Sequence, residues 1–403
     1  MTKTVIGIGL VAVSGIVGNV RADWLQFRGP GGSGVLEAGA LPAKLDGKGS
    51  IAWEAALPGE GLSSPVVVGE KVFVTCSSGA EQDRLHVFCL DSKNGKTLWE
   101  RQFWATGRTM HHEKTSVAAP SPCSDGEQVY AFYSSNDLAC MDLDGNVKWV
   151  RGLTVDYPNA SNSLGMASSP VVAGGVVVCL VENDSESFAA GIDPKTGRNV
   201  WKVARTKRAS WTSPVVFKDP TGGRELVALQ GSAGLDVLDP KTGKSVWSYS
   251  DGASTTPSLT VGDGVLFVPS RGLTALELKG GSEFEKTWQK GNLGPGTASP
   301  VASKDRVYVI SNAGVLSAAK VSDGEVLWKA RLEGPFSGSP VLSGDRLLAV
   351  SERGGIVQLV DLTGAEGTVI GKVELGETVL STPAVSGGAV YVRTDGKVWK
   401  LEG

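Results

Sequence analysis

Two near copies of one short segment decide the fold of this chain. They are Asp193-Pro-Lys-Thr-Gly-Arg-Asn-Val-Trp201 and Asp239-Pro-Lys-Thr-Gly-Lys-Ser-Val-Trp247. The Asp at the turn can bond backbone amides, the Gly permits a positive φ, and the hairpin then reverses into a strand that carries the Trp. An indole offers a large apolar surface and an N–H group that needs a partner, so we expect the Trp to pack between neighbouring sheets.

Looser copies of this closing segment occur along the chain, for example from Cys89 to Trp99 and from Asp142 to Trp149. Seven of eight closing positions carry a Trp, and the remaining one, in the seventh repeat, has Ile370. We expect these tryptophans to hold adjacent units together: Trp53, Trp99, Trp149, Trp201, Trp247, Trp288 and Trp328.

A second signal opens each unit, as a Ser/Thr-Pro step before a strand. It recurs eight times, at Pro65, Pro122, Pro170, Pro214, Pro257, Pro300, Pro340 and Pro383. Five of the seven intervals lie between 40 and 44 residues, a period typical of four short strands in a propeller blade. Residues 71–75 and 306–310 alternate as strands do, and no long helical pattern occurs. The sequence therefore predicts an all-β, eight-bladed propeller of four-stranded antiparallel blades.

The two ends of the chain are predicted to share the last blade. The eighth proline step is followed by only three strands, whereas residues 50–57 form a spare strand near the start. Trp53 precedes Pro65 by 12 residues, the interval that also separates Trp288 from Pro300. The N-terminal strand should therefore complete the last blade and leave no open sheet edge.

The N-terminus has the pattern of an export signal. Lys3 precedes an apolar or small run over residues 5–17, and Val20-Arg-Ala22 resembles a cleavage site, although an uncleaved N-terminus is the alternative. We expect an exported protein, periplasmic or extracellular. The expected organisation is a signal peptide over residues 1–22, an extension over the propeller at 23–49, and the propeller at 50–403.

Composition restricts the partners. The formal net charge is −3, so no overall basic field would attract nucleic acid. No segment after residue 22 is apolar over the roughly 18 residues that a membrane-spanning helix needs. We expect a monomer that neither binds nucleic acid nor spans a membrane.

The chain has five cysteines, an odd number: Cys76, Cys89, Cys123, Cys140 and Cys179. Cys89 and Cys140 stand where other repeats have small residues. We therefore expect buried packing residues rather than a disulfide framework.

The closing segment resembles the Ala-x-Asp-x-x-Thr-Gly-x-x-x-Trp motif of the pyrroloquinoline-quinone (PQQ) repeat family. The likeness extends from Trp53 to Leu401, and Asp23-Trp-Leu-Gln-Phe-Arg-Gly-Pro30 is similar to the mature start of many exported bacterial proteins with this repeat. The resemblance implies the propeller fold and leaves function open, because one fold hosts many activities.

One branch of that family, the quinoprotein dehydrogenases, holds the quinone and a calcium ion at the propeller centre. Its alcohol-oxidising members have two adjacent cysteines, and this chain has no such pair. The nearest acidic cluster, residues 183–186, lacks convincing calcium-ligand spacing and is otherwise a solvated loop. We expect no metal and no cofactor, with PQQ implied by the family resemblance alone.

The other branch is the outer-membrane assembly factor B, an eight-bladed lipoprotein that binds another assembly protein. This chain is similar in length and blade count but lacks the lipid-anchored Cys. The resemblance implies a binding scaffold of the same architecture and identifies no specific partner.

Two long connections, residues 100–119 and 150–169, are expected on one face, where propellers commonly carry function. The first contains the candidate ligand contacts Trp104, Arg108, His111 and His112. Its histidines suit metal binding or proton transfer, and equally a hydrogen-bonded loop. The second contains Asp156, Tyr157 and Asn162, which suit a sugar or peptide surface, or packing of the loop on itself.

Inner hairpins on the same face are expected to present further candidates, namely Asn183, Arg271, Arg353 and Arg393. Arginine and amide groups around a channel would favour an anionic or polyhydroxylated ligand. The alternative is a set of solvated turns.

Taken together, these features favour an exported, non-catalytic binding scaffold that presents polar loops to a protein or polysaccharide partner of the cell envelope. Two alternatives remain open, a PQQ-dependent dehydrogenase and a carbohydrate-active protein. We assign no catalytic residue, because the chain has no Gly-x-Ser-x-Gly segment between a strand and a helix.

Overall fold

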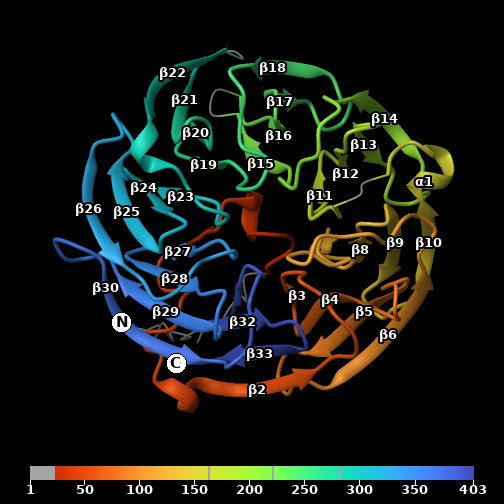
Figure 1. Cartoon of the computed structure of the whole chain (residues 1–403), viewed down its shortest axis with the longest axis horizontal. Helices are drawn as coiled ribbons and strands as arrows, with labels where there is room; N and C mark the ends of the chain where they lie inside the picture. Colours follow the sequence, from red (N-terminus) through yellow and green to blue (C-terminus); the bar gives the residue numbers. More distant parts are fainter. Residues whose placement is uncertain (1–22, 162–163, 220–221, 281–282) are drawn as a thin grey trace, which may run out of the picture.

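Eight four-stranded blades surround a central axis in the computed structural model (Figure 1). The structure describes residues 23–161, 164–219, 222–280 and 283–403, so the expected signal peptide and Asn162 lie outside the described residues. The fold predicted from the two repeating signals is confirmed.

The first four blades follow one another along the chain. Blade one contains β3 (Val66–Val68), β4 (Lys71–Ser78), β5 (Arg84–Asp91) and β6 (Thr97–Trp104). Blade two contains β7 (Cys123–Ser124), β8 (Gln128–Phe132), β9 (Asp137–Asp142) and β10 (Val147–Gly152), followed by α1 (Leu153–Asp156). Blade three contains β11 (Val171–Ala173), β12 (Val176–Val181), β13 (Phe188–Ile192) and β14 (Asn199–Ala204). Blade four contains β15 (Val215–Lys218), β16 (Glu225–Gly231), β17 (Gly234–Leu238) and β18 (Ser245–Tyr249).

The last four blades complete the ring. Blade five contains β19 (Thr260–Gly262), β20 (Val265–Val268), β21 (Leu273–Gly280) and β22 (Glu283–Lys290), followed by η3 (Gly291–Leu293). Blade six contains β23 (Val301–Ser303), β24 (Arg306–Ile310), β25 (Val315–Lys320) and β26 (Val326–Arg331). Blade seven contains β27 (Val341–Ser343), β28 (Arg346–Val350), β29 (Ile356–Asp361) and β30 (Thr368–Glu374). Blade eight contains β31 (Ala384–Ser386), β32 (Ala389–Arg393), β33 (Lys397–Leu401) and the N-terminal strand β2 (Ile51–Ala56).

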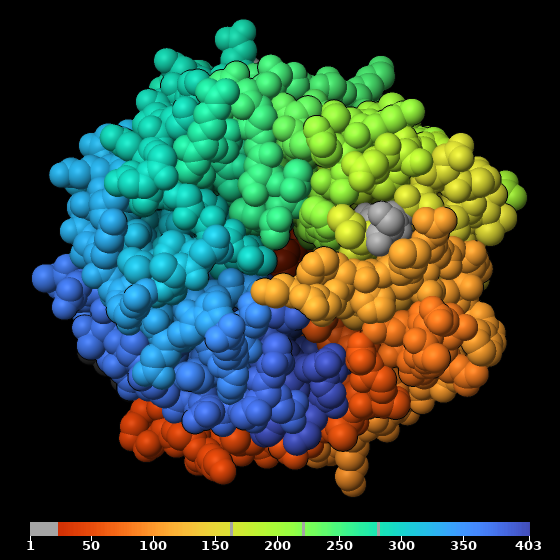
Figure 2. All heavy atoms as spheres, viewed as in Figure 1, coloured from red at the N-terminus to blue at the C-terminus, as the bar shows by residue number. Residues whose placement is uncertain are grey.

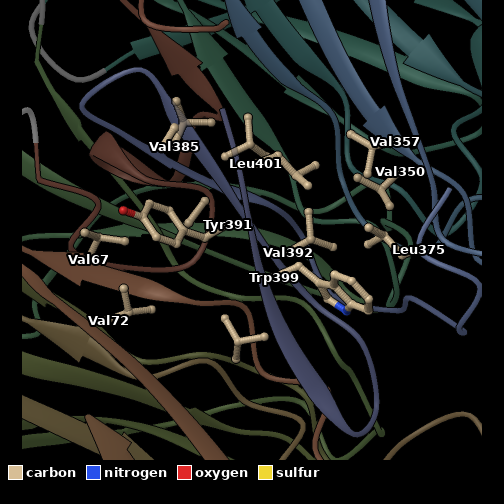
Figure 3. Close-up of a cluster of buried hydrophobic side chains, with 14 of the residues drawn as sticks. Val67, Val72, Val350, Val357, Leu375, Val385, Tyr391, Val392, Trp399 and Leu401 are labelled. Atoms are coloured by element: carbon tan, nitrogen blue, oxygen red, sulfur yellow. The ribbon is translucent and has the colours of Figure 1, made fainter. Parts of the chain in front are cut away.

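Strand β2 closes the ring as predicted. It pairs antiparallel with β33, and Trp53 lies opposite Lys400. Figure 3 shows the core that this closure joins, with Val67 from blade one, Tyr391 and Trp399 from blade eight, and Val357 from blade seven. Strand β2 and the three C-terminal strands thus form one sheet, which completes the ring.

A docked indole joins each pair of neighbouring blades where the repeat is strongest. The Trp201 ring of blade three lies against Gly243 of blade four, and a Cβ atom at Gly243 would stand only 2.6 Å from the indole. Gly243 also has a φ of 67°, which an L side chain rarely adopts. The Trp201 Nε1–H donates to the carbonyl of Pro240 at 2.7 Å. The Asp-Pro-Lys-Thr-Gly turn therefore receives the Trp of the preceding blade.

Blade seven departs from the sequence expectation at its closing position. In blade three Trp201 lies opposite Gly191, and the equivalent partner in blade seven is Gly371, not Ile370. A Cβ atom at Gly371 would stand 2.7 Å from the carbonyl oxygen of Leu45, a buried residue of the N-terminal extension. The expectation for Ile370 was wrong by one residue, because Ile370 occupies the β-bulge before the closing position, as Val200 does in blade three. The extension covers the place of the missing indole.

The N-terminal extension also blocks the central channel, and we name residues 24–36 the channel strap. Trp24 bridges to Val67 in blade one, and β1 (Val35–Leu36) pairs parallel with β27 in blade seven. The strap contains η1 (Pro30–Gly32), and η2 (Gly47–Ser50) follows it before β2. Segments of blades one and seven therefore contact one short peptide at the axis (Figure 1).

Arg28 anchors the strap inside the channel. Its guanidinium donates to the carbonyl of Leu259 at 2.8 Å and to that of Pro300 at 2.5 Å, which belong to blades five and six. The side chain is fully buried, and this burial lowers its pKa to about 9. Arg28 therefore holds a positive charge beside the inner strands of blades five and six at neutral pH.

Substitution at Gly243 tests the docked indole. Gly243→Ala is expected to cost about 1–2 kcal/mol for the left-handed backbone and about 1–3 kcal/mol more for displacing the Trp201 ring. Gly69→Ala is the matched control, because Gly69 has a φ of 56° but nothing lies within 4 Å of its Cβ position. Urea unfolding of both variants measures the difference. Equal losses of stability would contradict close packing of the indole as the reason for Gly243.

Candidate functional site

A closed ring of hydroxyl groups surrounds the channel at the start of the inner strands. Each Oγ accepts a hydrogen bond from the backbone N–H of the equivalent residue in the preceding blade, at 2.8–3.1 Å. The ring consists of Ser64, Ser121, Ser169, Ser213, Ser258, Ser299, Ser339 and Thr382. These residues form the Ser/Thr-Pro signal, except in blade five, where Ser258 follows Pro257 instead of preceding it.

The hydroxyl ring lines a funnel that the channel strap closes at one end. The cavity measures about 380 Å³, and Phe27 of the strap lines it together with all eight ring residues. Figure 2 shows this hollow at the centre of the open face, with atoms of the dark red N-terminal segment at its base. The propeller therefore has one accessible mouth on this face instead of an open channel.

The lining of the funnel combines hydroxyl groups with apolar side chains and carries no negative charge. Among the described residues that line it, His112 and Lys114 are the ionisable side chains, and neither Asp nor Glu occurs. Hydroxyl groups that accept an N–H bond keep a proton to donate. Together with the buried Arg28 in the strap, this arrangement favours an anionic or oxygen-rich group in the funnel.

The two long loops stand beside each other at the funnel mouth. The backbone N–H of His112 in the first loop donates to the carbonyl of Leu164 in the second at 2.9 Å. The Trp211 Nε1–H, from the connection into blade four, donates to the carbonyl of Gly165 at 3.0 Å. His112, Leu164 and Trp211 all line the funnel, so three connections form one wall of its mouth.

The adjacent histidines of the first loop have different environments. His112 lines the funnel, whereas the His111 ring lies 3.1 Å from the Gln82 side-chain nitrogen and 2.9 Å from the carbonyl oxygen of Thr109. No group of three or more His, Cys, Asp or Glu residues in the described ranges could hold a metal ion. His112 is thus the candidate of this pair that a ligand in the funnel could reach.

The other candidates on the first loop, Trp104 and Arg108, are not among the residues that line the funnel. The Trp104 side chain is 63% exposed at the end of β6, and the Arg84 guanidinium lies 4.5 Å from its ring centre. Arg108 is exposed on the loop. Both residues are accessible to a partner on the open face.

The candidates of the second loop contact blades two and three. Asp156 forms an ion pair with Arg151 at 2.6 Å. The Tyr157 ring meets Phe188 edge-on at 4.8 Å, and its hydroxyl accepts a hydrogen bond from Asn199. These contacts shape the base of the loop and do not face the funnel.

The four hairpin candidates do not form a ring around the funnel. Asn183 and Arg393 are buried, and Arg393 donates to backbone carbonyls, among them that of Thr394. Arg271 lines a separate cavity of about 410 Å³ between blades four, five and six, and Arg353 is exposed. The hydroxyl ring, which sequence reasoning missed as a site, encircles the axis in their place, and its signal was the residue beside each repeated proline.

The funnel does not fit the quinone and calcium pair of the dehydrogenase branch. A calcium ion is held by several oxygen ligands, carboxylates prominent among them, and the described funnel lining supplies none of those. All five cysteines are buried and unpaired, and burial raises the pKa of the Cys89 thiol to about 12. The residues present therefore suit a ligand that binds through hydroxyl groups, an imidazole and an ammonium group.

Eight blades joined by docked indoles, around a channel lined by repeated hydroxyls, define the class as a β-propeller of PQQ-type repeats. A family model of these repeats, described as "Outer membrane protein assembly factor BamB", matches residues 35–190, 157–267, 185–289 and 272–370. The chain belongs to this family.

Curated relatives from both branches match part of the chain. BamB of Moranella endobia (strain PCIT) is 23% identical over 220 residues, which cover 45% of this chain and 52% of that protein. Polyvinylalcohol dehydrogenase of Sphingopyxis sp. (strain 113P3) is 25% identical over 200 residues, covering 45% of this chain and 28% of that protein. The chain thus matches about half the length of the first relative and just over a quarter of the second.

Solved structures from both branches share the fold. BamB from Moraxella catarrhalis superposes with a TM-score of 0.62 at 18% identity, covering 87% of this chain and 96% of that one. A europium-containing methanol dehydrogenase superposes with a TM-score of 0.68 at 13% identity, covering 93% and 90%. At such identities these likenesses show the architecture alone.

Removal of one hydroxyl tests whether the hydroxyl ring stabilises the contact between adjacent blades. Ser169→Ala is expected to cost about 1–3 kcal/mol, because the buried N–H of Ser121 loses its acceptor. Ser169→Thr should restore most of this stability, since Thr382 already serves in the same role. Ser245→Ala, an exposed serine at the start of β18, should change the urea midpoint little. A Ser169→Ala protein as stable as the parent would contradict the ring as a link between blades.

Proposed function

We propose that this chain is an exported binding scaffold of the cell envelope, which docks a protein partner on its open face. The observation that carries this proposal is apolar exposure on the two long loops. Met110 is 56% exposed on the first loop, and Val155 and Leu164 are 71% and 42% exposed on the second. Exposed apolar side chains on loops are typical of protein-binding surfaces.

The loops are pre-organised for docking. The His112–Leu164 and Trp211–Gly165 hydrogen bonds tie the loops and blade four together without any partner. A surface that is already ordered loses little conformational freedom when a partner binds. Funnel residues at the mouth would then receive a polar or anionic group of the same partner.

The comparisons support a place in the envelope. Two relatives bear the name outer membrane protein assembly factor, and the sequence begins with the pattern of an export signal. Within the described ranges, no helix is both long and apolar enough to span a bilayer. The proposed scaffold therefore meets its partner from outside the bilayer core, as a monomer.

Site-specific photocrosslinking in cells tests this function. A photoreactive phenylalanine derivative in place of Met110 is expected to form an adduct with one envelope protein. The same residue in place of Val200, which is 52% exposed on the outer strand of blade three, is the matched control and should give none. Met110→Glu combined with Leu164→Glu should lower recovery of that partner about tenfold or more.

Three other outcomes would contradict the proposed docking function or favour another function. Equal crosslinking from both positions would contradict a docking face at the long loops. Binding to a polysaccharide on a glycan array, with no protein adduct, would favour the carbohydrate-active alternative. Reduction of a dye after addition of PQQ and calcium would favour the dehydrogenase alternative.

A further inference from the structure

Three side chains of blade one form a hydrogen-bonded relay that the proposed scaffold function does not use. The Ser78 Oγ lies 2.7 Å from Nε2 of His86, and the His86 Nδ1 lies 2.7 Å from Oε1 of Glu100. A hydroxyl, an imidazole and a carboxylate in this order are the parts of an activated serine nucleophile.

The register of the blade produces this arrangement. Ser78 lies opposite Arg84, and His86, two residues further along β5, lies opposite Gln102. Glu100 is two residues from Gln102 on β6, so the three relay residues project from one side of the sheet along a diagonal. Diagonal neighbours on adjacent strands are within reach of long side chains.

The hydrogen-bond partners fix which nitrogen of His86 carries the proton. An ionised carboxylate only accepts, and the Glu100 carboxylate also accepts from the Gln102 amide at 2.8 Å. The Nδ1–H of His86 therefore donates to Glu100, which leaves Nε2 to accept the hydroxyl proton of Ser78. The His86 side chain is only 4% exposed and stacks on Phe88, so its orientation is held.

A substrate could approach Ser78 from the open end of the strand. Ser78 is the last residue of β4 and is partly exposed, whereas His86 behind it is buried. Arg84 and the exposed Trp104 continue the same row across the sheet, with the guanidinium 4.5 Å from the indole centre. A cation beside an aromatic surface suits an organic substrate that carries a negative charge.

We propose that blade one carries an acyl-transfer site, separate from the funnel, that cleaves esters bearing a carboxylate. The Ser78 Oγ attacks the ester carbonyl while His86 takes the hydroxyl proton, the C–O bond to the alcohol breaks, and His86 gives the proton to the leaving alkoxide. Water, activated by His86, then attacks the acyl-serine, releases the acid and restores Ser78. Arg84 holds the substrate carboxylate, and Glu100 positions His86. Such triads recur on unrelated folds, so the site needs no strand–turn–helix elbow.

Covalent labelling of the full chain tests the nucleophile. An alkyl fluorophosphonate should react with Ser78, forming the P–O bond with loss of fluoride, and peptide mass spectrometry locates the adduct. Ser78→Ala should abolish the label. Ser303→Ala is the matched control, because Ser303 is a partly exposed serine at the end of β23 in blade six, and it should label like the parent.

Variants of His86, Glu100 and Arg84 distinguish the roles of these residues in the proposed reaction. His86→Asn should slow labelling about 10²-fold or more. Glu100→Gln should lower kcat for p-nitrophenyl esters with little change in KM, and Glu100→Asp should recover part of the loss. Arg84→Met should raise KM for a p-nitrophenyl ester of succinic acid and leave that for the acetate ester unchanged. Thermal unfolding checks that each variant is folded.

Labelling of a folded protein at other serines but not at Ser78 would overturn the proposal. So would a rate at Ser78 that folded Glu100→Gln and His86→Asn proteins share with the parent. Neither outcome bears on the docking face, because crosslinking from Met110 involves none of the relay residues.

Discussion

At most blade junctions, an indole ring that lies over a glycine fixes one blade to the next. The Trp201 ring meets Gly243, the Trp149 ring meets Gly197, and the Trp53 ring meets Gly95 across the point where the chain ends join. In each case the indole N–H also donates to a carbonyl of the same turn, those of Pro240, Pro194 and Ser92. One repeated contact therefore supplies apolar burial, a satisfied donor and the spacing between blades.

The inner side of the ring is organised by a different interaction. Eight hydroxyl groups link the backbones of adjacent blades. The channel strap then crosses the axis and bonds to blade one through Trp24 and to blade five, on the opposite side, through Arg28. The strap makes the propeller asymmetric, because it closes one end of the channel and leaves the funnel open on the face of the long loops. An otherwise repetitive fold thus acquires a single face suited to binding.

The sequence predicted the features that repeat and missed those that depend on non-local register. The Trp and Gly spacing was sufficient for eight blades and for closure by Trp53, since each is a local pattern. The contact of Leu45 with Gly371 could not be predicted, because it joins residues more than 300 positions apart. The hairpin residues Asn183 and Arg393 looked equivalent along the chain, yet burial turned both into structural groups.

The relay of blade one, too, could not be predicted from spacing along the sequence. Ser78, His86 and Glu100 lie on three successive strands, and no spacing motif joins them, because a diagonal contact depends on the register of two hairpins at once. Shifting either pairing by one residue would send one member to the opposite side of the sheet and break the relay. The docked Trp99, which is opposite Cys89 in the same two strands, fixes that register through its contact with blade two. The interaction that builds the propeller therefore also sets the geometry on which the reactivity of Ser78 depends.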